Sequence, residues 1–192
     1  MINIAIFASG NGSNAENISS YFNQNSTINV SIIISNNKNA YVHERAKKLG
    51  IPSFTFSKTE FICGDEILKR MKEYDIDFIV LAGFLLKVPQ LIIDAYPNRI
   101  INIHPALLPK YGGKGMYGGF VHQAVKDANE TETGITIHYI NENYDEGDII
   151  FQAKCKVLDT DTYTDIAQKV QTLEQCHFPE IIESVVKKIV EK

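Results

Sequence analysis

The sequence predicts a mostly parallel α/β sheet with helices on both faces and an antiparallel strand pair toward the C-terminus. Two observations support this fold class. Up to about residue 105, short apolar runs alternate with amphipathic stretches, which is typical of parallel strands covered by helices. After residue 130, two apolar runs follow each other with only a short polar loop between them, and this spacing favours a hairpin.

Each expected element has its own signal. Apolar runs rich in β-branched residues predict strands at residues 2–8, 28–35, 51–56, 77–83 and 99–105. Helical spacing of apolar residues predicts helices at residues 13–23, 40–49, 60–74 and 88–96. The hairpin strands are expected at residues 134–140 and 148–157. A long helix from about Asp161 to Glu191 closes the chain, and Pro179 is the position at which it could break.

Composition limits the class of protein. The chain has 192 residues, of which 44% are hydrophobic and 22% charged, so one domain with a sizeable core is expected. A net charge of −4 argues against sequence-independent nucleic-acid binding. Cys63, Cys155 and Cys176 are far apart and lack metal-ligand spacing, so we expect reduced thiols, no metal and a cytoplasmic protein. No leader or membrane-spanning run, which needs about 20 apolar residues, is expected.

The turn after the first strand reads Ser9-Gly10-Asn11-Gly12-Ser13-Asn14. Its backbone N–H groups and the following helix N-terminus are typical of an anion site at the carboxyl edge of a sheet. The turn lacks the lysine of a triphosphate-binding loop. Residues 35–38 lack the acidic ribose partner of a dinucleotide site. A phosphate site and a tight turn without a ligand are therefore both open at this point.

The fifth strand ends in Asn102-Ile103-His104-Pro105. Residues two apart on a strand face the same side, so Asn102 and His104 are expected to share one face of a cleft. An amide can donate to a developing oxyanion, and an imidazole can move a proton near neutral pH. The alternative is a histidine that is merely hydrogen-bonded at a strand end.

The hairpin loop at residues 141–147 contains Asp145. A carboxylate close to His104 would favour the imidazolium and raise the histidine pKa. The alternative is a solvated acidic loop, and the residues alone do not decide between the two. Of the other histidines, His43 and His122 are expected at the surface, and His138 is expected to have a partly buried structural role.

Four motifs occur in a fixed order: SGNGSN, LAGF, NIHPALLPKYGG and YDEGDIIFQ. Together they resemble the phosphoribosylglycinamide formyltransferase family, almost from end to end. The resemblance implies a Rossmann-like formyltransferase fold and a single domain over residues 1–192. It also implies an N-terminal half that binds the phosphate-bearing substrate and a C-terminal half that binds folate. The implied reaction transfers the formyl group of the co-substrate 10-formyltetrahydrofolate to the amine of 5-phosphoribosylglycinamide in de novo purine biosynthesis, without a metal.

The resemblance also implies individual roles. The catalytic residues are Asn102, His104 and Asp145. The substrate-binding residues are Gly12, Ser13, Asn14, Gln171 and Glu174. The folate-binding residues are Leu85, Leu86, Lys87, Val88, Asn102, Asn141, Glu142, Asn143, Tyr144 and Asp145. Because Leu86 stands where some members carry arginine, Lys58 or Lys87 is the candidate for holding the glutamate tail of folate.

Three other functions are weighed against this one. A formyltetrahydrofolate hydrolase would use water as acceptor, but that family usually carries a further N-terminal domain and lacks SGNGSN. Methionyl-tRNA formyltransferases carry a further C-terminal domain. A non-catalytic nucleotide-binding module of the same fold would not need Asn102, His104 and Asp145. We expect small-molecule partners only, no nucleic acid or membrane, and a monomer or weak homodimer.

Overall fold

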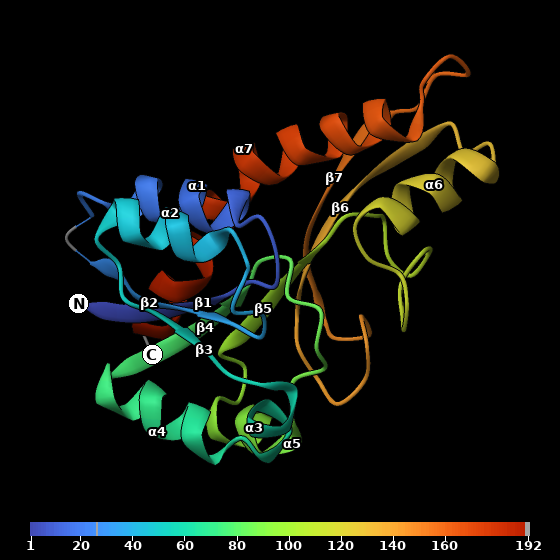
Figure 1. The fold of residues 1–192 in the computed structure, drawn as a ribbon. Helices are drawn as coiled ribbons and strands as arrows, with labels where there is room; N and C mark the ends of the chain where they lie inside the picture. The colour runs from blue at the N-terminus through green and yellow to red at the C-terminus, as the bar shows by residue number, and fades with distance from the viewer. Residues whose placement is uncertain (26, 191–192) are drawn as a thin grey trace.

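The computed structural model describes residues 1–25 and 27–190. Within them, seven strands form one sheet in the order β3-β2-β1-β4-β5-β6-β7 (Figure 1). The strands are β1 (Ile2–Phe7), β2 (Ile28–Ser35), β3 (Ser53–Thr55), β4 (Ile76–Leu81), β5 (Ile100–His104), β6 (Glu132–Tyr139) and β7 (Ile149–Lys156). The first five pair in parallel, whereas β6 and β7 are antiparallel. The predicted fold class is confirmed.

Helices cover both faces of the sheet. They are α1 (Ser13–Phe22), α2 (Val42–Leu49), α3 (Lys58–Cys63), α4 (Asp65–Glu73), α5 (Gln90–Ala95), α6 (Gly119–Asp127) and α7 (Tyr163–Val190). Figure 1 shows α1, α2 and α7 above the sheet and α3, α4 and α5 below it. The turns after β1, β4 and β5 all leave the same edge of the sheet, because these strands are parallel.

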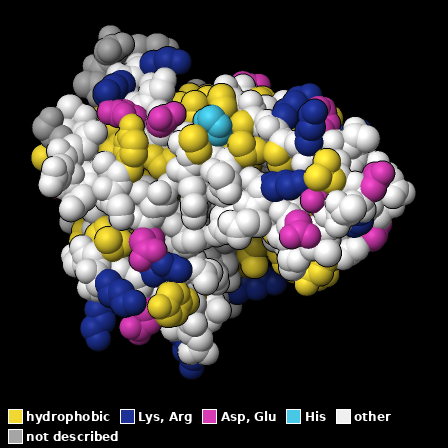
Figure 2. All heavy atoms as spheres, turned by 90° about the horizontal axis from the view of Figure 1, so that it is seen from above, with side chains coloured by type: hydrophobic (Ala, Val, Ile, Leu, Met, Phe, Trp, Pro, Cys, Tyr) yellow, Lys and Arg dark blue, Asp and Glu magenta, His cyan; other side chains and the backbone are white. Residues whose placement is uncertain are grey.

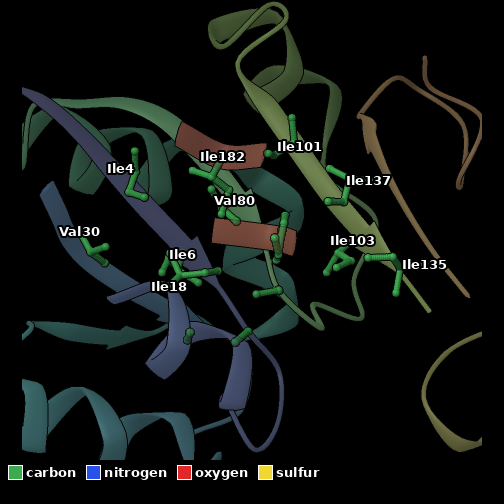
Figure 3. Close-up of a cluster of buried hydrophobic side chains, with 14 of the residues drawn as sticks. Ile4, Ile6, Ile18, Val30, Val80, Ile101, Ile103, Ile135, Ile137 and Ile182 are labelled. Carbon is green, nitrogen blue, oxygen red and sulfur yellow. The ribbon is translucent and has the colours of Figure 1, made fainter. Parts of the chain in front are cut away.

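Alternation along β1 explains why the sheet has two apolar faces. Ile4 and Ile6 pack into the hydrophobic cluster between the sheet and helices α1 and α7, which Figure 3 shows in close-up. Ala5 and Phe7 point the other way, into the hydrophobic cluster between the sheet and helices α3, α4 and α5. A strand buried on both faces needs apolar residues at every position, which is why the parallel strands read as continuous apolar runs.

One expectation about the helices is wrong, and one possibility that the sequence left open is decided. The single helix expected over 60–74 is two helices, because Gly64 adopts a left-handed conformation with φ 81° and ends α3. The final helix does not break at Pro179. Phe178 and Ile182 on either side are fully buried, so packing holds the helix across the missing N–H donor. The helix end expected at Glu191 lies outside the described residues.

Charged side chains of both signs lie on the surface, and the cysteines are unpaired. Figure 2 shows basic and acidic side chains interspersed on the upper face rather than a continuous basic surface. Cys63, Cys155 and Cys176 are free thiols. In the part of the chain that the structure describes, no helix has the length and apolar character needed to cross a membrane.

Candidate active site

A cavity of about 970 Å³ lies at the carboxyl edge of the parallel strands. The segments that line it include the turn after β1 (residues 10–14), the loop after β4 (82–87), the end of β5 (102–105), residues 113–119, and parts of the hairpin loop and α7. Loops at this edge are where open α/β sheets bind ligands. The cavity therefore brings together all four sequence motifs.

The turn after β1 is fixed from behind by α2. Gly12 has φ 76°, and a Cβ atom built on it would lie 2.4 Å from Cγ2 of Val42. Arg45 donates from Nε to the Asn11 carbonyl oxygen at 2.9 Å and from Nη2 to Asn11 Oδ1 at 2.7 Å. Glycine is required at position 12 by both its backbone conformation and its packing. The N-terminus of α1 is thereby held toward the cavity, where its first N–H groups can bind an anion.

Ser9 connects this turn to the loop after β4. Its hydroxyl donates to Asn36 Oδ1 at 2.6 Å and accepts from the backbone N–H of Leu85 at 2.9 Å. The Ser9 backbone N–H also donates to the carbonyl oxygen of Gly83 at 3.1 Å. The predicted substrate side and the predicted folate side of the cavity are thus held in one fixed arrangement.

A polar contact joins α1 to α7 at the back of the cavity. Asn14 Nδ2 donates to Glu174 Oε2 at 2.9 Å, and Gln171 Nε2 donates to Ser13 Oγ at 3.4 Å. Burial raises the pKa of Glu174, although the Asn14 hydrogen bond acts in the opposite direction. Asn14 Oδ1 is buried and has no partner among the described residues. An unpaired buried acceptor is costly, because it has lost its hydrogen bonds to water.

His104 is 3% exposed and lies between two acceptors. Its Nε2 is 2.7 Å from the carbonyl oxygen of Tyr111, and its Nδ1 is 3.6 Å from Asp145 Oδ2. A carbonyl oxygen can only accept, so Nε2 carries a hydrogen. Burial lowers the pKa of His104, although Asp145 and the Tyr111 carbonyl both act to raise it. The expected rise in this pKa is therefore wrong in its net direction, because desolvation exceeds the attraction of the carboxylate.

Asp145 is oriented by three groups. Its Oδ2 accepts from the backbone N–H of Gly113 at 2.9 Å and faces His104, while its Oδ1 is 3.6 Å from Nε2 of His138. Burial raises the pKa of Asp145, but the interactions with His138, His104 and the Gly113 N–H outweigh it and hold the pKa below its usual value. The predicted pairing of Asp145 with His104 is present in the structure.

The other predicted site residues divide into two groups. Those that line the cavity are Gly12, Ser13, Asn14, Leu85, Leu86, Lys87, Tyr144, Gln171 and Glu174. Those that lie outside its lining are Val88, Asn141, Glu142 and Asn143. The two candidate lysines for the folate tail, Lys58 and Lys87, both line the cavity and are exposed. The roles of all these residues stay predictions.

Two histidines are more buried than the sequence predicts. His122, predicted at the surface, is 6% exposed and lines the cavity, and burial together with His104 lowers its pKa. His138 was expected to be partly buried but has no exposed surface and contacts both Asn102 and Asp145. His122 lies in a helix whose residues Val121 and Val125 are buried, and this apolar pattern could have indicated that His122 is buried too.

The chain is similar to known formyltransferases over almost its whole length. The formyl transferase family matches residues 2–182. The chloroplastic phosphoribosylglycinamide formyltransferase of Arabidopsis thaliana is 36% identical over 188 residues, which cover 95% of this chain. The chain spans only 64% of the length of that plant protein.

Two bacterial relatives match over nearly their whole length. The phosphoribosylglycinamide formyltransferase of Bacillus subtilis (strain 168) is 33% identical over 190 residues, covering 96% of this chain and 95% of the relative. A crystal structure of phosphoribosylglycinamide formyltransferase from Bacillus halodurans is 33% identical and has a TM-score of 0.88, covering 97% of this chain and 96% of the other. The resemblance predicted from the four ordered motifs is confirmed.

Proposed function

The chain belongs to the formyl transferase family, and on that basis we propose that it transfers the formyl group of 10-formyltetrahydrofolate to the amine of 5-phosphoribosylglycinamide. The observation that carries the proposal is a cavity that joins the glycine-rich turn after β1 to Asn102, His104 and Asp145. Because these groups line one space, a phosphate-bearing amine and a formyl donor can meet there.

The substrate binds at the side of the cavity formed by α1 and α7. The N-terminus of α1 takes the phosphate through backbone N–H groups at Gly12, Ser13 and Asn14. The Glu174 carboxylate lies on the same side and is an acceptor for the substrate's N–H groups.

Folate binds on the opposite side, against the loop after β4. Leu85, Leu86 and Lys87 line this part of the cavity, and Tyr144 faces it from the hairpin loop. Ser9 holds the backbone of this loop through the Leu85 N–H, so the loop is positioned before the ligand arrives. Such prior positioning reduces the entropy that is lost on binding.

In the reaction, the amine nitrogen attacks the formyl carbon, a C–N bond forms and the carbonyl oxygen becomes an oxyanion. Asn102 donates to that oxygen, and His104 takes up the proton that the attacking nitrogen loses, with Asp145 stabilising the imidazolium. The bond from the formyl carbon to N10 of the folate then breaks. The proton held by His104 passes to N10, so the ring returns to its neutral form and the chemistry needs no oxidant or reductant.

The test follows tetrahydrofolate formation by absorbance, with and without 5-phosphoribosylglycinamide. Turnover that requires the amine supports the proposal. Equal turnover without the amine would replace it with hydrolysis, and binding of both ligands without turnover would indicate a non-catalytic module. Asn102→Ala should abolish most of the signal, whereas Asn29→Ala, on the exposed part of β2, serves as a control for the loss of an asparagine.

A further inference from the structure

His138 lies directly opposite Asn102 across the antiparallel pairing of β5 and β6. Its imidazole ring has no exposed surface. Asn102 Nδ2 is 3.1 Å from His138 Nε2, and Asp145 Oδ1 is 3.6 Å from the same nitrogen. The ring therefore contacts two of the three predicted catalytic residues without lining the cavity itself.

The other ring nitrogen decides the tautomer. His138 Nδ1 is 2.8 Å from the backbone carbonyl oxygen of Tyr139, which can only accept. Nδ1 therefore carries a hydrogen, and in the neutral ring Nε2 has a lone pair. In that state the lone pair accepts from the Asn102 amide at 3.1 Å, whereas Asp145 Oδ1, at 3.6 Å, lies beyond hydrogen-bond distance of Nε2, so the NH₂ group of Asn102 faces the ring.

From this geometry we infer that His138 is a positioning residue, which fixes the Asn102 side-chain amide so that its second N–H points to the reacting oxygen. One Nδ2 hydrogen is taken by His138, and the other is available to a ligand because Asn102 lines the cavity. Without the ring nitrogen, the amide could rotate by half a turn and present its oxygen to the developing oxyanion. The inference rests on the proposed function and adds the residue that sets the direction of its oxyanion donor.

A purely structural role for His138 makes a different prediction. A buried ring that only fills space could be replaced by phenylalanine with little effect on turnover, provided that the protein folds. A ring that orients Asn102 should lose turnover on the same change while the two substrates bind nearly as before, because most of the predicted binding residues lie in other segments of the cavity. The two roles are therefore separated by the effects on kcat and KM.

The kinetic test combines His138→Phe with Asn102→Ala. His138→Phe should lower kcat by about 10- to 100-fold with KM changes below about twofold. His138→Gln, whose amide oxygen can accept in place of Nε2, should recover most of that loss. In the Asn102→Ala background, His138→Phe should cause no further decrease in kcat. Independent, multiplicative losses, or a His138→Phe enzyme with normal kcat, would overturn the inference.

A second measurement needs neither a variant nor turnover. Two-dimensional ¹H–¹⁵N NMR of the histidine rings in the intact protein should show that the neutral His138 ring carries its hydrogen on Nδ1 and not on Nε2. The opposite tautomer, with the hydrogen on Nε2, would refute the inference directly. If the wild-type protein has no transferase activity, the proposed function fails, and the NMR result still decides the hydrogen bond to Asn102.

Discussion

Replacing Asp145 by asparagine tests the electrostatic part of the proposed mechanism with little change in shape. Asp145 has φ 55°, a left-handed conformation that asparagine tolerates better than alanine. The asparagine oxygen can still accept from the Gly113 N–H, which holds the side chain in place. The change therefore removes the negative charge beside His104 and leaves the backbone and its anchoring hydrogen bond intact.

The magnitude follows from the geometry. Two unit charges separated by the 3.6 Å between His104 Nδ1 and Asp145 Oδ2 attract by about 4 to 5 kcal/mol at an effective dielectric constant of about 20. This is an upper bound, because both charges are spread over two atoms. A loss of roughly 3 to 4 kcal/mol in the transition state corresponds to a decrease in kcat on the order of 10²- to 10³-fold.

The direction in which the His104 pKa should change in Asp145→Asn follows from the same contacts. Burial already lowers its pKa, and Asp145 is the largest influence that acts to raise it. In Asp145→Asn the pKa should fall further, so a smaller fraction of the ring is protonated at any pH. NMR titration of His104 and single-turnover kinetics measure both effects on the same samples.

The matched control is Asp148→Asn, which removes the same charge from an exposed position on the hairpin loop. It should leave the His104 titration and kcat unchanged. Both ligands should bind Asp145→Asn with nearly normal affinity. An unchanged His104 titration together with near-normal turnover in Asp145→Asn would show that the pair has no catalytic role.

Three further outcomes are expected. Glu174→Ala should raise KM for the amine substrate by about tenfold while the folate dissociation constant stays within about twofold, and an unchanged KM would remove Glu174 from the site. Binding of the folate glutamate tail should weaken only slightly as salt is added, because the exposed Lys58 and Lys87 are already screened by solvent. A steep salt dependence of the folate affinity that disappears in Lys87→Ala would assign the tail carboxylates to that lysine. Gly12→Val should lower the melting temperature and weaken the binding of both ligands together, because the Cβ atom of the new side chain would lie 2.4 Å from Val42 Cγ2. Selective loss of binding of the phosphate-bearing substrate would contradict this packing argument.

Local patterns predicted most of the fold. Apolar runs identified the strands because β1, β2 and β4 are buried on both faces, and their parallel order followed from the intervening helices. The two-residue spacing of Asn102 and His104 correctly placed both side chains on the cavity. These predictions succeeded because the information lies within a few residues of the chain.

Residues whose role depends on long-range pairing were missed. His138 reads as one more residue in a strand that is apolar on both sides, and its alternation gives no indication of its partner. Only the antiparallel register of β5 with β6 places it opposite Asn102, 36 residues away in the chain. The division of the 60–74 helix was missed for a different reason, since Gly64 between two helical stretches reads equally well as an interior residue or as a helix end.

The pKa of His104 shows why the site chemistry needed the structure. Sequence reasoning could consider only the nearest charge, Asp145, and that charge does act to raise the pKa. The larger effect is desolvation, which depends on how many segments close over the ring. A buried, neutral His104 with both nitrogens directed at acceptors is ready to bind a second proton when negative charge appears beside it. Asp145 then stabilises the imidazolium at the moment the oxyanion forms, and burial prevents the ring from holding that charge earlier, when it would only stabilise the free protein.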